Sequence, residues 1–136
     1  VIGMKAKSRQ ENTKLDPKRI NRAALQLFFN ISDHWELSTK EQRVLLGEPP
    51  ESTFFKWKAE LEARRLNRDT LDRISYLSGI YKALHILLPS ARAADEWIKK
   101  PNKSPVFAGN SALNRMLAGG VEDLAFVRRY LDAQRG

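Results

Sequence analysis

The 136-residue sequence offers few side chains that could carry out catalysis or hold a metal ion. It has no cysteine, which excludes disulfides, thiolate nucleophiles and cysteine zinc sites. Neither of its two histidines, His34 and His85, has a second histidine or a carboxylate at metal-ligand spacing. Without a Gly-x-Ser-x-Gly motif, an enzyme would depend on carboxylates, and these are scattered along the chain. We therefore expect no enzymatic activity, no metal site and no cofactor, and we assign both histidines structural roles.

Hydroxyl and basic side chains gather instead in a segment typical of a helix-turn-helix unit. Ser38 and Glu41 have the spacing of a capping box, which predicts that a short helix begins there. Gly47 and the following Pro49-Pro50 predict its end. A second short helix follows, for which Ser52 is the expected N-cap.

The second helix of this unit has one apolar and one polar face. Phe54, Trp57 and Leu61 share the predicted core side. The N-terminal part of such a helix enters the major groove, so the opposite side would face DNA. The expected contacts to bases or phosphates are Ser52, Thr53, Lys56, Lys58, Lys40, Arg43, Arg64 and Arg65. The alternative is an ordinary helical hairpin with solvated lysines, and Glu48 and Glu51 in the turn would repel phosphates.

The charge balance favours a polyanionic partner. The chain has 24 Lys and Arg against 16 Asp and Glu, a formal net charge of +8. Such an excess attracts nucleic acid, although a merely soluble basic surface gives the same count. Residues 1–70 and 71–136 each carry a formal charge of +4, so charge alone does not locate a binding face.

The remaining pattern predicts an all-α protein. Residues 1–15 are polar and are interpreted as a flexible arm. Asp16-Pro17 predicts the start of a helix in which Ile20, Ala24, Leu27 and Ile31 form a buried stripe. Apolar residues over 71–88 predict a long buried helix on which the others pack, and shorter helices follow, with Gly119-Gly120 separating the last two. No apolar run approaches the roughly 20 residues of a membrane span, so we expect a cytoplasmic protein without a membrane partner.

The last predicted helix, residues 121–134, has two apolar faces. Leu124, Val127 and Leu131 form one stripe, and the aromatic pair Phe126 and Tyr130 points away from it. The second face packs either inside the domain or on a partner. The polar residues beside it are Arg128, Arg129, Asp132 and Arg135, and arginine together with tyrosine is typical of binding hot spots.

Two stretches have a pattern more specific than any helix-turn-helix signature. They are Tyr76-Leu77-x-Gly79-Ile80-Tyr81-Lys82-Ala83-Leu84, preceded by Arg73-Ile74-Ser75, and the run from Trp97 through Pro101-Asn102 to Phe107-x-Gly109. Together with Leu45-Leu46-Gly47-x-Pro49 and Val127-Arg128-x-Tyr130-Leu131-Asp132-Ala133 they resemble the Xre/MbcA/ParS antitoxins over about residues 17–136.

This resemblance implies an antitoxin of a type II toxin-antitoxin module. Residues 16–69 would form an Xre-like helix-turn-helix domain that binds the operon's own promoter, and residues 70–136 a helical toxin-binding domain. The usual partners in this family are RES-domain toxins, which degrade NAD+ or transfer its ADP-ribose moiety. The C-terminal region would lie across the entrance of the toxin's NAD+ pocket. The residues expected to bind the toxin are Phe126, Arg128, Arg129, Tyr130, Asp132, Arg135 and Gly136.

A homodimer is the expected DNA-binding form, because one short recognition helix gives little affinity and paired half-sites restore it. Two other interpretations stay open. One is a helix-turn-helix transcriptional regulator whose C-terminal half only dimerises. The other is a helical adaptor that makes no contact with DNA.

Overall fold

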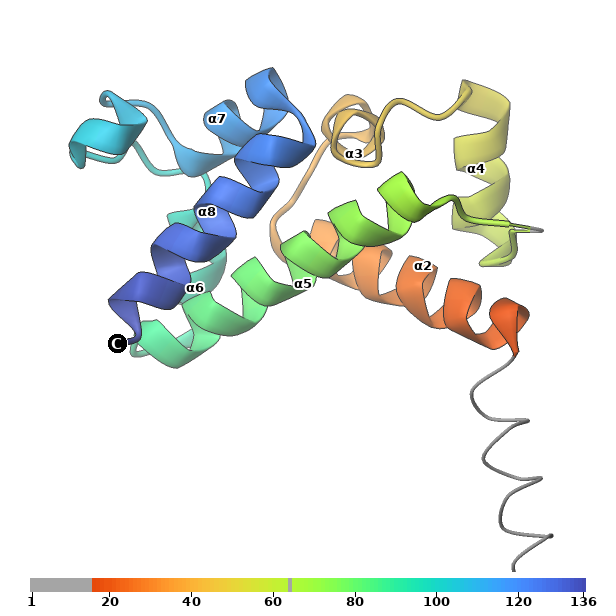
Figure 1. Cartoon of the computed structure of the whole chain (residues 1–136), viewed down its shortest axis with the longest axis horizontal. Coiled ribbons are helices and arrows are strands. Elements are labelled where there is room, and N and C mark those ends of the chain that lie inside the picture. The colour runs from red at the N-terminus through yellow and green to blue at the C-terminus, as the bar shows by residue number, and fades with distance from the viewer. Residues whose placement is uncertain (1–15, 64) are drawn as a thin grey trace, which may run out of the picture.

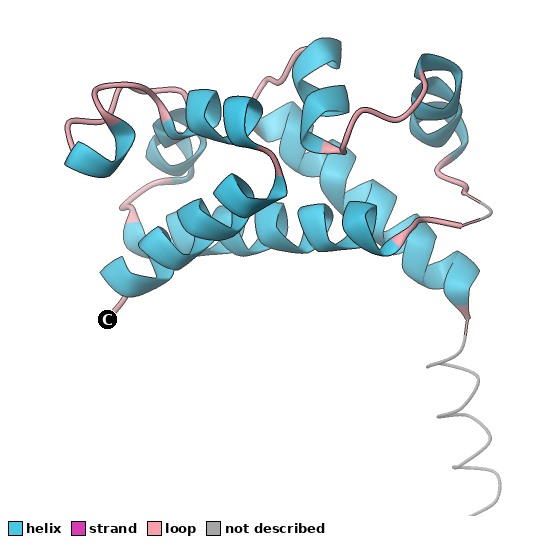
Figure 2. Ribbon diagram, turned by 45° about the horizontal axis from the view of Figure 1, so that its top comes forward, coloured by secondary structure: helices cyan, strands magenta, loops and turns pink. Residues whose placement is uncertain are grey.

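The chain folds into α-helices of 7 to 20 residues, with the longest lying across the middle of the molecule (Figures 1 and 2). The computed structural model describes residues 16–63 and 65–136, so the predicted arm and the predicted DNA contact Arg64 lie outside the described residues. In chain order the elements are α2 (Pro17–His34), α3 (Thr39–Leu45), α4 (Glu51–Glu60), α5 (Arg68–Leu87), α6 (Ala91–Trp97), the 3-10 turn η1 (Pro105–Phe107), α7 (Ala112–Gly119) and α8 (Val121–Gln134). These residues contain helices and loops but no β-strand, which confirms the predicted all-α class.

Helix α5 is the hub predicted by its apolar pattern. It crosses the middle of the molecule between α2 and α8 (Figure 1) and packs on both, as well as on α6. Its buried apolar side chains are Ile74, Leu77, Ile80, Ala83 and Leu84. Because the first and last helices pack on the same helix, the N-terminal and C-terminal parts share one hydrophobic core.

Most of the helices begin at an N-cap residue whose side chain accepts a hydrogen bond from the first turn. The caps are Asp16 for α2, Ser38 for α3, Asn67 for α5, Ser90 for α6 and Ser111 for α7. Each oxygen accepts hydrogen bonds from N–H groups of the first turn, which have no partner inside the helix. Ser38 and Glu41 form the predicted capping box. None of the helices in the described ranges is long and apolar enough to cross a membrane.

Helix α4 begins differently from the prediction. Its N-cap is Pro50, its first helical residue is Glu51, and no side chain caps it, so the expectation that Ser52 is the cap was wrong. The physical reason is the Pro49-Pro50 pair. Proline fixes φ near the helical value, here −52° at Pro50, so the helix begins directly after it.

The buried face of α2 matches the prediction only in part: Ile31 is buried and Ala24 is half-buried, as predicted. Ile20 and Leu27 are 48% and 40% exposed, whereas Phe28 and Phe29 are buried. The ring of Phe29 lies edge-on to that of Phe54 in α4, with centroids 5.8 Å apart. Burial of large aromatic rings is strongly favourable, which explains why α2 turns Phe28 and Phe29 toward the core.

Candidate functional sites

Helices α3 and α4 form the predicted helix-turn-helix, and α5 holds its turn in place. Gly47 has a φ of +90°, a conformation that favours glycine. A Cβ at this position would lie 3.0 Å from Asp69 Oδ2 and 3.1 Å from Arg73 Nε, atoms that pair with each other at 2.8 Å. Arg73 Nη1 also lies 3.5 Å from the carbonyl oxygens of Val44 and Leu45. Arg73 therefore offers a donor to carbonyl oxygens that have no partner at the end of α3, and it fixes the turn against α5.

The predicted DNA contacts in α4 are largely accessible. Ser52, Lys56 and Lys58 are exposed, and Thr53 is half-buried. Phe54 is fully buried on the side of the helix opposite Ser52 and Lys56, as the pattern predicted. The helix can therefore present hydroxyl and ammonium groups to a ligand while Phe54 anchors it in the core.

The rest of the predicted core face of α4 is less buried. Trp57 and Leu61 are only half-buried. Leu61 is the C-cap, in the left-handed conformation with a φ of +52°, and so lies beyond the last helical residue, Glu60. The helix thus ends one residue before the last apolar position of the predicted face, and Trp57 and Leu61 still pack against the edge of the core.

The predicted flanking phosphate contacts have different surroundings. Lys40, in the first turn of α3, and Arg65, after α4, are exposed. Arg43 is half-buried, and its Nη2 donates to the carbonyl oxygen of Pro49 at 3.1 Å. The Arg43 guanidinium is thus engaged inside the turn, a contact that the sequence pattern did not predict.

Helix α8 packs against α5 (Figure 1). Leu124, Val127 and Leu131 are buried, whereas Phe126 and Tyr130 on the other face are half-buried. Part of that second face is covered by the chain itself. The ring of Phe107 in η1 lies edge-on to Phe126 and Tyr130, with centroids 6.5 Å and 5.1 Å away. The aromatic pair is therefore partly covered by the chain itself and partly exposed to solvent.

One arginine joins the three elements around this aromatic group. Arg115 of α7 pairs with Asp123 of α8 (Nε to Oδ1, 2.9 Å) and donates from Nη1 to the carbonyl oxygen of Val106 at 2.6 Å. Its Cζ lies 3.7 Å from the ring centroid of Phe126, a cation–π contact. The Asp123 carboxylate occupies the space that a side chain at Gly119 would need. Nothing in the local spacing indicated this role of Arg115.

Of the charged residues of α8 predicted to bind a toxin, Arg129, Asp132 and Arg135 are exposed and Arg128 is half-buried. Arg128 and Arg135 both approach Asp132, each with a nitrogen 3.7 Å from a carboxylate oxygen. Arg129 is exposed and takes part in no ion pair within the described ranges. Gly136, also exposed, follows the end of the helix.

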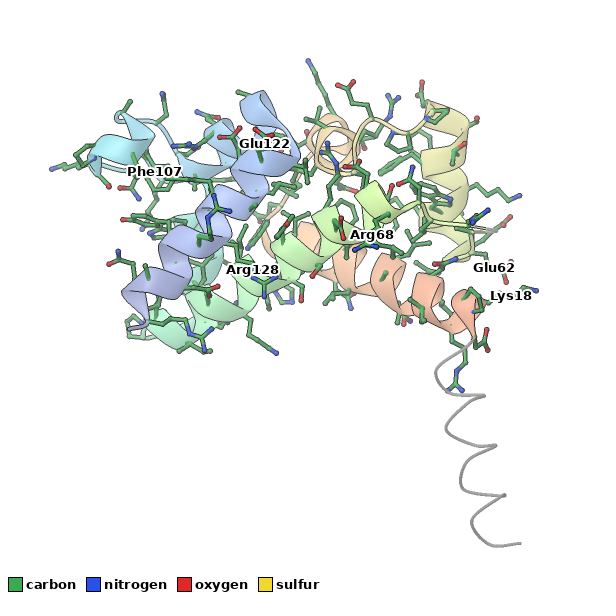
Figure 3. All side chains as sticks on the ribbon, in the orientation of Figure 1. Lys18, Glu62, Arg68, Phe107, Glu122 and Arg128 are labelled. Atoms are coloured by element: carbon green, nitrogen blue, oxygen red, sulfur yellow. The ribbon has the colours of Figure 1, made fainter. Side chains whose placement is uncertain are left out.

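Arg128 lies between α8 and α5, where Gly79 leaves room for it (Figure 3). A Cβ at Gly79 would lie 2.5 Å from Arg128 Nε and 2.7 Å from its Cζ. This explains physically why a glycine stands inside a buried helix, where it costs about 1 kcal/mol relative to alanine.

Both histidines contact one carboxylate that the sequence spacing did not reveal. His85 Nε2 lies 3.1 Å from Asp95 Oδ1, and His34 Nδ1 lies 3.4 Å from Asp95 Oδ2. The ring of Tyr81 lies over His85, with centroids 4.2 Å apart. Burial, and secondarily the charge of Asp95, raises the pKa of Tyr81 above its ordinary value of 10.0. No group of three or more His, Asp or Glu within residues 16–63 and 65–136 could hold a metal ion.

Comparison with known proteins agrees with this architecture. The family described as antitoxin Xre-like helix-turn-helix domain matches residues 14–79, and the antitoxin Xre/MbcA/ParS C-terminal toxin-binding domain matches residues 83–136. The uncharacterized protein y4oB of Sinorhizobium fredii (strain NBRC 101917 / NGR234) is 50% identical over 114 residues, which cover 84% of this chain and 85% of that protein. The two matched regions meet inside α5, the helix that both halves share. The chain therefore belongs to the Xre/MbcA/ParS antitoxins, as a type II antitoxin with a helix-turn-helix domain followed by a toxin-binding domain.

Proposed function

We propose that this antitoxin inhibits a RES-domain, NAD+-consuming toxin with its C-terminal helix and represses its own operon through the helix-turn-helix. The observation that carries the first part is the outer side of α8. There, half-buried Phe126 and Tyr130 stand beside exposed Arg129. Aromatic and guanidinium groups in one partly exposed patch are typical of binding hot spots.

The inhibition needs no chemistry from the antitoxin. The side chains of α8 would cover the entrance of the nucleotide pocket, and the guanidinium groups of Arg128, Arg129 and Arg135 would pair with acidic groups around it. Phe107 and Arg115 already hold Phe126 in place. Because this surface is ordered before binding, little conformational entropy is lost when the toxin docks.

For the second part, α4 would enter the major groove of promoter DNA. Ser52, Thr53 and Lys56 are on the accessible side near its N-terminus, and Lys40 and Lys58 could contact phosphates on either flank. A homodimer would place two such helices about one duplex turn apart, which multiplies the affinity of each.

A substitution in α4 tests the DNA contact. Lys56→Ala should weaken binding to the promoter duplex by about tenfold, since a good base or phosphate contact contributes roughly 1–3 kcal/mol. It should leave toxin inhibition unchanged. Lys82→Ala, which removes an exposed cation from α5, is the matched control. Equal loss of both activities, or of neither, would contradict this division of labour.

A substitution in α8 tests the toxin contact. Deleting the chain from Arg128 onward would also remove buried Leu131, so a single exposed residue gives a cleaner test. Arg129→Glu should lower affinity for the co-purifying toxin by tenfold or more, by the order of magnitude known for hot-spot residues. Lys103→Glu, an equal charge change at another exposed site, is the control.

Co-expression with the product of the adjacent gene decides between this function and a plain transcriptional regulator. An antitoxin should co-purify with that product and prevent NAD+ depletion in the cell. A regulator whose C-terminal half only dimerises would do neither.

A further inference from the structure

A groove of about 680 Å³ lies between the start of α2 and the C-terminal part of α4. Figure 3 shows Lys18 and Glu62 together at this end of the molecule. Its rim carries five cations and two carboxylates, Glu60 and Glu62, which leaves a clear excess of positive charge. The cations are Lys18, Arg19, Arg22, Lys56 and Arg65.

These five cations are free to meet a ligand. All five are exposed, and none forms an ion pair or a side-chain hydrogen bond with another described residue. Because the cations outnumber the two carboxylates, they repel one another, and an approaching polyanion relieves that repulsion.

The apolar floor of the groove indicates which kind of polyanion fits it. It contains the half-buried apolar side chains of Trp57, Leu61 and Ala63. A free phosphate would use only the charged rim. The backbone of a DNA strand alternates charged phosphates with the apolar faces of deoxyribose, so it fits both the rim and the floor.

The groove is also continuous with the surface that would read bases. Thr53 and Lys56 belong both to its lining and to the exposed side of α4. A strand whose bases face α4 in the major groove would therefore continue past the start of α2.

We propose that this groove, which we call the α2–α4 groove, holds the sugar-phosphate backbone of operator DNA beside the base pairs that α4 reads. Lys18, Arg19 and Arg22 contact the phosphates. The inference rests on the proposed DNA binding and adds a second contact region outside the helix-turn-helix unit. These contacts raise affinity for any duplex and carry no sequence information.

The salt dependence of binding tests this assignment. The probes are a duplex of about 30 base pairs, roughly three duplex turns, from the promoter region of the protein's own operon and a shuffled duplex of equal composition. Each phosphate contact adds about 0.9 to the slope of log K against log salt. Replacing Lys18, Arg19 and Arg22 by glutamine should lower that slope by about 2 to 3 per protomer. The preference for the promoter duplex should stay unchanged.

A matched variant and a folding check complete the experiment. Lys82→Gln, Lys100→Gln and Lys103→Gln together remove the same charge from exposed positions elsewhere and should leave the slope near that of the wild type. Circular dichroism checks each variant, and the three single glutamine variants replace the triple one if it does not fold.

Each outcome decides the proposal. If the wild type binds neither duplex, the proposed DNA binding and this inference are both wrong. If the wild type binds and the glutamine variant keeps its slope, only the groove assignment is wrong. Loss of the promoter preference together with the slope would show base reading by α2 and overturn the assignment. Loss of toxin co-purification at an unchanged slope would make the groove a protein-binding site and overturn it as well.

Discussion

The cations of the N-terminal and C-terminal parts differ in how they are used. The five in the α2–α4 groove are exposed and unpaired among the described residues. Most of those in α6 to α8 are paired with carboxylates, as in Arg92–Glu96, Arg115–Asp123 and Arg128–Asp132. The two halves of the sequence have equal formal charge, so the difference appears only in three dimensions. Free cations suit a polyanion, whereas paired arginines beside aromatic rings suit a shaped protein surface.

The two parts are nevertheless joined by α5. Near its start Arg73 fixes the helix-turn-helix turn, and two turns later Gly79 makes room for Arg128 of α8. The stretch that carries the family resemblance thus has a physical role at two positions, Arg73 and Gly79. Different partners would bind opposite ends of one packed unit.

The largest effect should come from removing a core aromatic ring from either part. Phe54→Ala and Phe107→Ala should each lower the free energy of unfolding by about 3–5 kcal/mol, since both rings are buried. Because the parts share one core, urea denaturation followed by circular dichroism should show a single transition in both variants. Two separate transitions would make the parts independent folding units. Phe55→Ala, at a ring that is 44% exposed, is the control with a much smaller expected loss.

Next in size is the loss of the arginine that orders the second face of α8. Arg115→Ala removes the contacts to Asp123, the Val106 carbonyl and the Phe126 ring, and should cost about 1–3 kcal/mol. Toxin affinity should fall because Phe126 and η1 lose their fixed arrangement, while promoter affinity stays the same. Calorimetric titration measures the affinity for the toxin, and fluorescence anisotropy measures the affinity for the promoter duplex. A fall in promoter affinity without a fall in toxin affinity would contradict the assignment of the two partners to different parts of the molecule.

A smaller effect is expected where α5 and α8 meet. Gly79→Ala should displace the Arg128 guanidinium and weaken toxin binding several-fold, with little net change in stability because alanine favours the helix by about 1 kcal/mol. In an Arg128→Ala background the same change should have no further effect on toxin affinity. An equal loss in both backgrounds would mean that Gly79 does not act through Arg128.

The smallest effect concerns pH and lies at the junction of the two parts. The pKa of Tyr81 is raised by burial and by Asp95, so the folded state holds this proton more tightly than the unfolded chain does. The contribution of this proton to the free energy of unfolding should therefore be fully present below about pH 10. It should be lost as pH rises through the pKa that Tyr81 has in the folded state. Tyr81→Phe should make the fall in unfolding free energy from about pH 9 to about pH 11 shallower. Superimposable pH curves for the two proteins would contradict this role.

Local rules were enough to predict much of this fold. The caps at Asp16 and Ser38, the turn at Gly47 and the inward stripe of α8 each depend on residues within four positions of one another. Contacts between distant elements were not predictable in this way. The outward position of Ile20 depends on the packing of α2 on α4.

The same limit applies to the candidate sites. Spacing placed Phe126 and Tyr130 on a second face of α8 but could not show that Phe107, from a separate loop, covers part of it. It also missed Asp95 between the two histidines, because α6 brings that carboxylate to them. Such pairings are decided by how helices cross, and no periodicity within one helix contains that information.

The most direct test of the account measures cellular NAD+ after induction of the adjacent toxin together with wild-type antitoxin, Lys56→Ala or Arg129→Glu, all expressed from a constitutive promoter. Wild type and Lys56→Ala should keep NAD+ near its uninduced level, and Arg129→Glu should let it fall. Protection by Arg129→Glu together with depletion in Lys56→Ala would contradict it, because the toxin would then be held by the helix-turn-helix end of the molecule.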